Sequence, residues 1–134
     1  MRLLLLLIIS FFLVTPGIAA TIASKTVWQG KKTITEKVRV ESDAHLIIES
    51  GSIVVFEGGS LEVAGRLTAR NVKFSGKKWS GIVLKGCGLD TLVTGSEVSG
   101  AKIGIQVVGG EPRLEEMTFT GNDIGVELRQ QSEA

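Results

Sequence analysis

Two segments of the sequence, 21 residues apart, carry the same pattern: EVSGAKIGIQV at residues 97–107 and TFTGNDIGVEL at residues 118–128. In both segments large apolar residues alternate with small or polar ones, and both glycines fall at matching places. Alternation over a few residues, bounded by glycine, is typical of short β-strands. A repeat of such strands at a fixed interval indicates a coiled chain in which each turn lies on the previous one.

The pattern also predicts which side chains lie above one another. A similar segment at residues 74–84, with a slightly longer loop, adds a third copy. Successive turns should stack about 4.8 Å apart through parallel backbone hydrogen bonds, so that equivalent inward residues form columns. The expected pairs are Val98 with Phe119, Ile103 with Ile124, Ile105 with Val126, and Val93 with Leu114. These columns are expected to form the core.

The remainder of the chain after residue 25 contains short alternating runs and no long helical stripe. Turn-forming segments such as SGS at residues 50–52 and EGGS at residues 57–60 separate these runs. We therefore predict an all-β fold, a short parallel β-helix of about four to five coils over residues 38–129. A linker and N-terminal cap is expected at residues 20–37, and a polar tail at residues 130–134.

The stretch from Phe119 to Leu128, with the pattern F-x-G-N-x-x-G-V-x-L, resembles the repeat of right-handed parallel β-helices of the pectate-lyase-like superfamily. The same repeat is similar to that of the periplasmic β-helix proteins that mature the copper sites of nitrous oxide reductase. The resemblance covers residues 26–129 and implies a right-handed coil. It implies neither an activity nor metal binding.

The first residues have the three regions of a secretory signal peptide. Arg2 precedes an uncharged apolar run at residues 3–14, and the small residues Gly17 and Ala19 precede an expected cleavage site after Ala19. Cleavage after Ala20 is the neighbouring alternative. Retention as a membrane anchor is disfavoured, because the run is shorter than the roughly 20 residues that span a bilayer. We therefore expect residues 1–19 to be a signal peptide and the protein to be exported, periplasmic or extracellular.

The composition excludes several kinds of partner and covalent link. Without Arg2, the 14 basic residues balance the 14 acidic ones. Nucleic acid is not an expected partner, because phosphate binding needs a cationic surface. Cys87 is the only cysteine, so no intrachain disulfide can form. We favour a small core residue at this position over an intermolecular disulfide.

The ionisable residues form no catalytic pattern. Catalytic β-helices gather Asp, Arg, Lys or His on neighbouring coils, and acid–base chemistry needs two such groups close together. Here the acidic residues are scattered, and no two carboxylates stack in the aligned copies. His45 is the only histidine, which excludes a histidine-built metal centre. We expect no catalytic residue, no metal and no cofactor.

One candidate ligand contact remains, formed by Trp79 with Lys77 and Lys78 in one loop. An indole face can stack on a sugar ring, but the competing interpretation is that Trp79 packs over the edge of a coil. Trp28 is expected to cover the N-terminal end of the core.

The sequence favours an exported scaffold or binding module of the carbohydrate-associated, cell-surface type, without its own catalytic site. The alternatives are a shortened or remnant polysaccharide lyase or hydrolase, and a purely structural envelope component. The expected partner is a glycan or another envelope component. A last coil with an exposed apolar end would also allow self-association or pairing with a longer protein.

Overall fold

The computed structural model describes residues 20–130, which form sixteen short strands and no helix. All strand pairs are parallel, and the strands belong to three sheets. Sheet A contains β1 (Ala20–Ile22), β4 (Lys37–Val40), β7 (Ser60–Val63), β10 (Gly81–Lys85), β13 (Ile103–Val108) and β16 (Ile124–Arg129). Sheet B contains β2 (Thr26–Trp28), β5 (His45–Ile48), β8 (Arg66–Arg70), β11 (Leu92–Thr94) and β14 (Arg113–Glu115). Sheet C contains β3 (Lys31–Ile34), β6 (Ile53–Phe56), β9 (Lys73–Gly76), β12 (Glu97–Ser99) and β15 (Thr118–Thr120).

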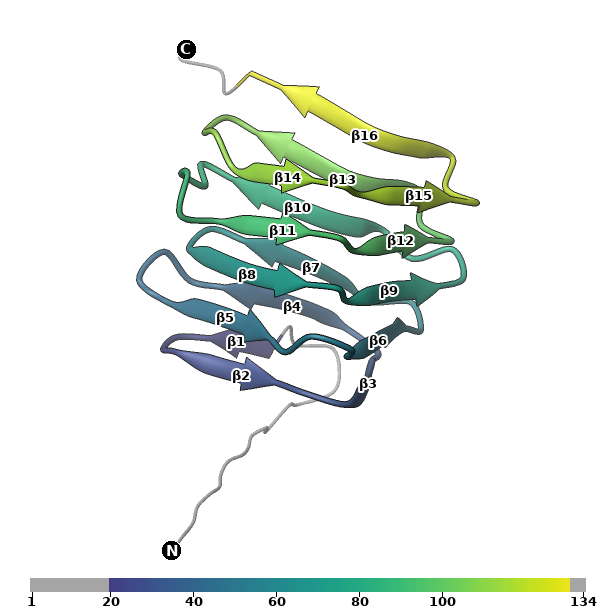
Figure 1. Cartoon of the computed structure of the whole chain (residues 1–134), viewed down its shortest axis with the longest axis horizontal. Coiled ribbons are helices and arrows are strands. Elements are labelled where there is room, and N and C mark those ends of the chain that lie inside the picture. Colours follow the sequence, from purple (N-terminus) through teal and green to yellow (C-terminus); the bar gives the residue numbers. More distant parts are fainter. Residues whose placement is uncertain (1–19, 131–134) are drawn as a thin grey trace, which may run out of the picture.

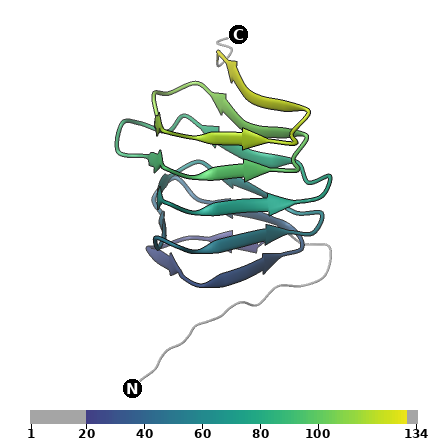
Figure 2. The same cartoon turned by 45° about the vertical axis from the view of Figure 1, so that its right-hand side comes forward.

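Each coil takes one strand from sheet B, then one from sheet C, then one from sheet A, which gives five coils. Figure 1 shows the coils stacked with β1 to β3 at one end and β14 to β16 at the other, and Figure 2 shows the same stack after a turn of 45°. The prediction of an all-β parallel solenoid of four to five coils is confirmed.

The register of the last two coils is the one that the repeat predicts. Val98 pairs with Phe119, and Val93 pairs with Leu114. In sheet A, β13 and β16 pair along most of their length, with the pairs Ile103 with Ile124 and Ile105 with Val126 among them. The 21-residue repeat therefore corresponds to one coil.

The coils begin earlier than the sequence predicted. The sequence predicts a linker and N-terminal cap at residues 20–37, but these residues contain β1, β2 and β3 and the first residue of β4. These three strands pair with β4, β5 and β6, so they belong to the stack. β3 departs from the pattern of its column, because Lys32 occupies a position that is apolar in later coils, where Val54 and Phe74 follow it. The expected signal peptide at residues 1–19 lies outside the described residues.

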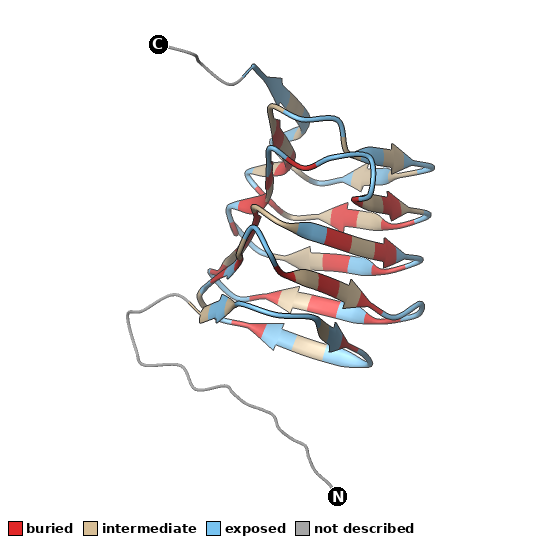
Figure 3. Ribbon diagram, turned by 90° about the vertical axis from the view of Figure 1, so that its left-hand side faces the viewer, coloured by how far each residue is buried: buried red, intermediate tan, exposed pale blue. Residues whose placement is uncertain are grey.

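The core is a set of columns that run along the coil axis. In strands, successive side chains point to opposite faces, so every second residue enters the core. Figure 3 shows the resulting alternation of buried and exposed positions along the middle strands. One column of sheet A consists of Val38, Leu61, Ile82 and Ile105, and one of sheet C consists of Val54, Phe74 and Val98, all of them buried.

Two glycines allow neighbouring coils to approach at the bends. Gly81 has φ +107°, and a Cβ placed there would lie 1.7 Å from the carbonyl oxygen of Ile103 in the next coil. Gly100 has φ +77°, and its Cβ would lie 1.8 Å from the oxygen of Gly76. Both positions combine a conformation that disfavours side chains with a backbone contact that leaves no room for one.

Candidate functional site

The outer face of sheet A presents one column of side chains that crosses all six strands. Leu61 and Val63 enter the core from β7, so Glu62 between them points outward. The register places its equivalents in the same outward column: Thr21, Arg39, Glu62, Val83, Gln106 and Glu127. The ion pairs of this face lie over β4, β7 and β10, because Lys37 of β4 and Lys85 of β10 both contact Glu62 of β7.

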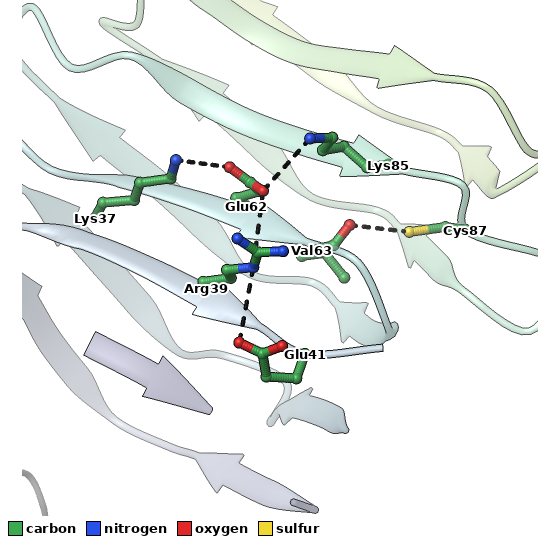
Figure 4. Close-up of polar contacts among 7 residues, drawn as sticks. All are labelled: Lys37, Arg39, Glu41, Glu62, Val63, Lys85 and Cys87. Carbon is green, nitrogen blue, oxygen red and sulfur yellow. Dashed lines mark hydrogen bonds and ion pairs between the residues drawn. The ribbon is translucent and has the colours of Figure 1, made fainter. Parts of the chain in front are cut away.

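Glu62 is the centre of a charge cluster that consists of Lys37, Arg39, Glu41, Glu62 and Lys85 (Figure 4). One carboxylate oxygen of Glu62 lies 2.7 Å from the Lys37 ammonium. The other lies 3.8 Å from Lys85 Nζ and 4.0 Å from Arg39 Nε. The cations come from β4 and β10, the strands on either side of β7. The cluster therefore depends on three neighbouring coils.

The cations cover the carboxylate and remain accessible themselves. The side chain of Glu62 is 10% exposed, whereas those of Lys37 and Lys85 are each 51% exposed. The hydrogen bond from Lys37 is the main cause that lowers the pKa of Glu62. The positive charges of Lys85 and Arg39 act in the same direction, and burial opposes them. Glu62 is therefore ionised at neutral pH.

The cluster has more positive than negative charge. Glu41 adds a second carboxylate, whose oxygen lies 3.7 Å from Arg39 Nε. Three cations thus face two carboxylates. An ammonium group has three N–H donors and a guanidinium group has five, more than the carboxylates here occupy. The cluster can consequently donate hydrogen bonds to an anionic ligand that approaches the outer face of sheet A.

The structure does not place Trp79 at the surface. Its side chain is 1% exposed, and its ring stacks on Phe56 with centroids 3.9 Å apart and an interplanar angle of 4°. Its Nε1 donates a hydrogen bond of 2.9 Å to the carbonyl oxygen of Ser99. The prediction of Trp79 as a sugar platform is therefore wrong, and the competing interpretation of a packing role is correct.

Lys77 and Lys78, the other two residues of the predicted contact, are exposed on the loop between β9 and β10. Lys78 has φ +56°, and its backbone N–H donates a hydrogen bond to the oxygen of Gly100. With Trp79 buried, these lysines have no aromatic partner in their own loop. The predicted three-residue contact is not formed.

Cys87 and His45 have structural surroundings. The Cys87 thiol is buried and lies 3.4 Å from the oxygen of Val63, and burial raises its pKa. This agrees with its prediction as a core residue. His45 Nε2 lies 2.8 Å from the hydroxyl of Thr68, and partial burial together with the nearby Arg66 lowers the pKa of the imidazole.

The residues of the charge cluster are visible in the sequence, but their proximity on neighbouring strands is not. Lys37 and Arg39 lie in KVRV, Glu62 in SLEV and Lys85 in GIVLK. Arg39 pairs with Glu62, 23 residues later, whereas Glu62 pairs with Val83, 21 residues later. The 21-residue repeat therefore aligns β7 with β10 but not β4 with β7, because the loops of the coils differ in length. A search that allowed this variation, anchored on the buried residues of each strand, would have found the column.

Comparisons with protein-family models, with curated proteins and with solved structures found no match to this chain. Within residues 20–130, no helix is long and apolar enough to cross a membrane. Over the same range, no three His, Cys, Asp or Glu side chains come together in a way that could hold a metal ion.

Proposed function

We propose that this protein is an exported, non-catalytic β-helix that binds acidic glycans of the cell envelope on the outer face of sheet A. The observation that supports the proposal is the charge cluster around Glu62, in which accessible cations surround one covered carboxylate. The excess positive charge favours a ligand that carries carboxylate or sulfate groups.

The geometry of the face suits an extended polymer better than a small molecule. Lys37 and Arg39 lie on β4, and Lys85 lies on β10, with β7 between them. Two strand spacings separate these positions by about 10 Å. A polymer with anionic groups at a similar separation can contact both sets of cations at once. Neutral Val83 and Gln106 continue the face beyond the cluster.

The electrostatics favour binding over catalysis. A general acid at neutral pH needs a carboxyl group whose pKa is raised. The pKa of Glu62 is lowered instead, and the cations cover its oxygens. Glu62 therefore suits the role of an anchor that holds Lys37 and Lys85 in place.

The same proposal includes export and kinship with the pectate-lyase-like β-helices. Export is supported by the signal-peptide pattern of residues 1–19, and kinship by the repeat at residues 119–128 together with the parallel solenoid. A polymeric envelope glycan is the type of ligand that an exported protein meets.

The proposal is tested by measuring binding of the purified protein to a glycan array that contains uronate, sulfated and neutral polymers. We expect binding to uronate or sulfated polymers that weakens as salt is raised, because exposed charges are screened. The double variant Lys37→Gln/Lys85→Gln should bind at least about tenfold more weakly. The matched control is Lys31→Gln/Lys73→Gln, which removes two exposed lysines from sheet C.

Three outcomes would contradict the proposal. Equal loss in the control variant would show a nonspecific charge effect. Binding to no glycan would favour a purely structural envelope component. Release of reducing ends or unsaturated products from a bound polymer would favour a remnant lyase or hydrolase.

A further inference from the structure

The last coil, β14 to β16, exposes positions that are buried in every other coil. Within residues 20–130 its strands pair on one side only, with β11, β12 and β13. Ile105 in β13 is fully buried, whereas its counterpart Val126 in β16 is 40% exposed. Leu128 is 75% exposed. Figure 3 shows β16 largely in the colour of exposed residues. An apolar strand with a free edge is a surface for pairing with another chain.

The opposite end of the stack is closed to the same kind of contact. Trp28 and Ile34 of the first coil are buried, and the Lys32 ammonium lies 5.3 Å from the centroid of the Trp28 ring. Lys32 is the first member of the column that ends at Phe119. Stacking the last coil of one copy on the first coil of the next would bury this ammonium against Phe119. Burial of an unpaired charge is strongly unfavourable.

We propose that the last coil binds the last coil of a second copy, as a closed dimer related by a two-fold axis perpendicular to the coil axis. Such an axis through the middle of sheet A reverses the strand direction, so β16 lies antiparallel to β16 of the second copy. The axis exchanges the other two sheets, so β14 lies against β15 of the second copy. Inward residues stay inward, and the two cores become continuous.

The residues of β14 and β15 are complementary in this arrangement. With Leu114 opposite Phe119 of the second copy, two inward apolar side chains meet. The flanking outward residues Arg113 and Glu115 then lie opposite two threonines, Thr120 and Thr118. No like charges face each other, which would destabilise a strand pair.

The sequence of β16 selects one register with itself. When Val126 lies opposite Val126, Ile124 lies opposite Leu128, and Glu127 lies opposite Gly125. The same register brings Arg129 opposite Asp123 of the second copy, twice across the interface. Moving the register by two residues, so that Glu127 centres the pair, would place two carboxylates side by side. The apolar positions and the charges thus agree on a single register.

The first test is the mass of the purified full chain by sedimentation equilibrium across the micromolar range. We expect a dimer, and Leu128→Lys should be monomeric because it places charges in the apolar contact. Leu128 is exposed in the single chain, so this variant should keep its fold, which circular dichroism checks. The matched control Leu89→Lys, on the loop between β10 and β11, should remain dimeric. A wild-type monomer, or an open series of larger assemblies, would overturn the proposal.

The second test identifies the register. Asp123→Arg and Arg129→Asp alone should each weaken the dimer about tenfold, since each creates two like-charge pairs, and the double variant should restore it. Val126→Cys should form a covalent dimer on oxidation, because the two new thiols face each other. Leu128→Cys should not, since its two copies would be about 14 Å apart. Additive loss in the double variant, or cross-linking only through residue 128, would contradict this interface.

Discussion

At the scale of single residues, Glu62 is the one charged side chain within residues 20–130 that is buried. A buried carboxylate is tolerated when ion pairs and hydrogen bonds offset the loss of water. Lys37 supplies the shortest of these contacts, at 2.7 Å. Without the negative charge of Glu62, three cations would lie close together and repel one another. Glu62 therefore keeps the cations of the proposed binding face in place.

Glu62→Gln should lower the free energy of unfolding by about 1–3 kcal/mol at pH 7. The pKa of Glu62 is lowered in the folded protein, so its contribution is fully present above the ordinary glutamate pKa of 4.5. The contribution is lost as the pH falls through the lower pKa that Glu62 has in the folded protein. Urea unfolding at pH 7 and in acid measures the difference, which should shrink in acid. The exposed Glu57 offers the control Glu57→Gln, and an equal effect there would refute this role.

Trp79→Ala should lower the free energy of unfolding by about 3–5 kcal/mol, because it removes the stack on Phe56 and leaves a cavity. This is a large part of the stability of a small domain. Chemical unfolding followed by circular dichroism measures the change. Lys78→Ala alters the exposed neighbour and should stay within about 0.5 kcal/mol of wild type. Similar stability in both variants would argue against a core role for the indole.

The sequence could not predict whether the side chain of Trp79 points into the core or toward solvent. In the two 21-residue copies, alternation assigns each strand residue to the core or the surface. The loop between Gly76 and Gly81 is longer than the equivalent loops, so alternation stops being a guide inside it. Only the contacts with Phe56 and Ser99 decide that the ring points inward.

At the scale of elements, the bends decide whether neighbouring strands can pair. Gly81 begins β10 and approaches the backbone of β13 at Ile103. Gly58 also has a positive φ, +85°, but a Cβ placed there would have no atom within 4 Å apart from those of Gly58 and its two chain neighbours. Substitutions at these two glycines therefore distinguish the cost of a positive φ from the cost of a steric overlap with the next coil.

Gly81→Ala should destabilise the fold by several kcal/mol more than Gly58→Ala. The second variant bears only the cost of a left-handed conformation, about 1–2 kcal/mol. The first adds an overlap with the Ile103 oxygen, which forces β10 and β13 apart. Urea midpoints of the two variants provide the comparison. If they matched, close approach between coils would not be the reason for glycine at residue 81.

The strands of the later coils could be predicted with their pairing, and those of the first coil could not. The copies at residues 97–107 and 118–128 have equal spacing, and their strands carry apolar residues at the paired inward positions. In β3 the inward position holds Lys32, which the first coil permits because β3 pairs only with β6 within residues 20–130. An end coil thus departs from the pattern of the coils that it caps.

At the scale of the whole molecule, contacts join each coil only to its neighbours. The stability of such a protein is approximately a sum over coils and the interfaces between them. Strands with partners on both sides, such as β7 and β10, therefore open less readily than β16, which has one partner among the described strands.

Amide hydrogen exchange should reveal this gradient. Protection should be strongest in β7 and β10 and weakest in β16 at low protein concentration. As the concentration rises, protection of β14 to β16 should increase, because the proposed dimer supplies the missing partner strand. The Leu128→Lys variant should lack this increase while keeping the protection of β7. Uniform protection along the stack at all concentrations would contradict both the gradient and the dimer.

The constant register between the fourth and fifth coils has a consequence for how such a chain can change in length. Excision of residues 98–118 would join Glu97 directly to Phe119, and every inward residue that follows would still meet an inward residue below it. Duplication of the same segment would add one coil to the stack and leave the register of the other coils unchanged. A chain of this kind can therefore gain or lose complete coils. The loss of a single residue within one strand would instead turn the core side chains of that strand outward.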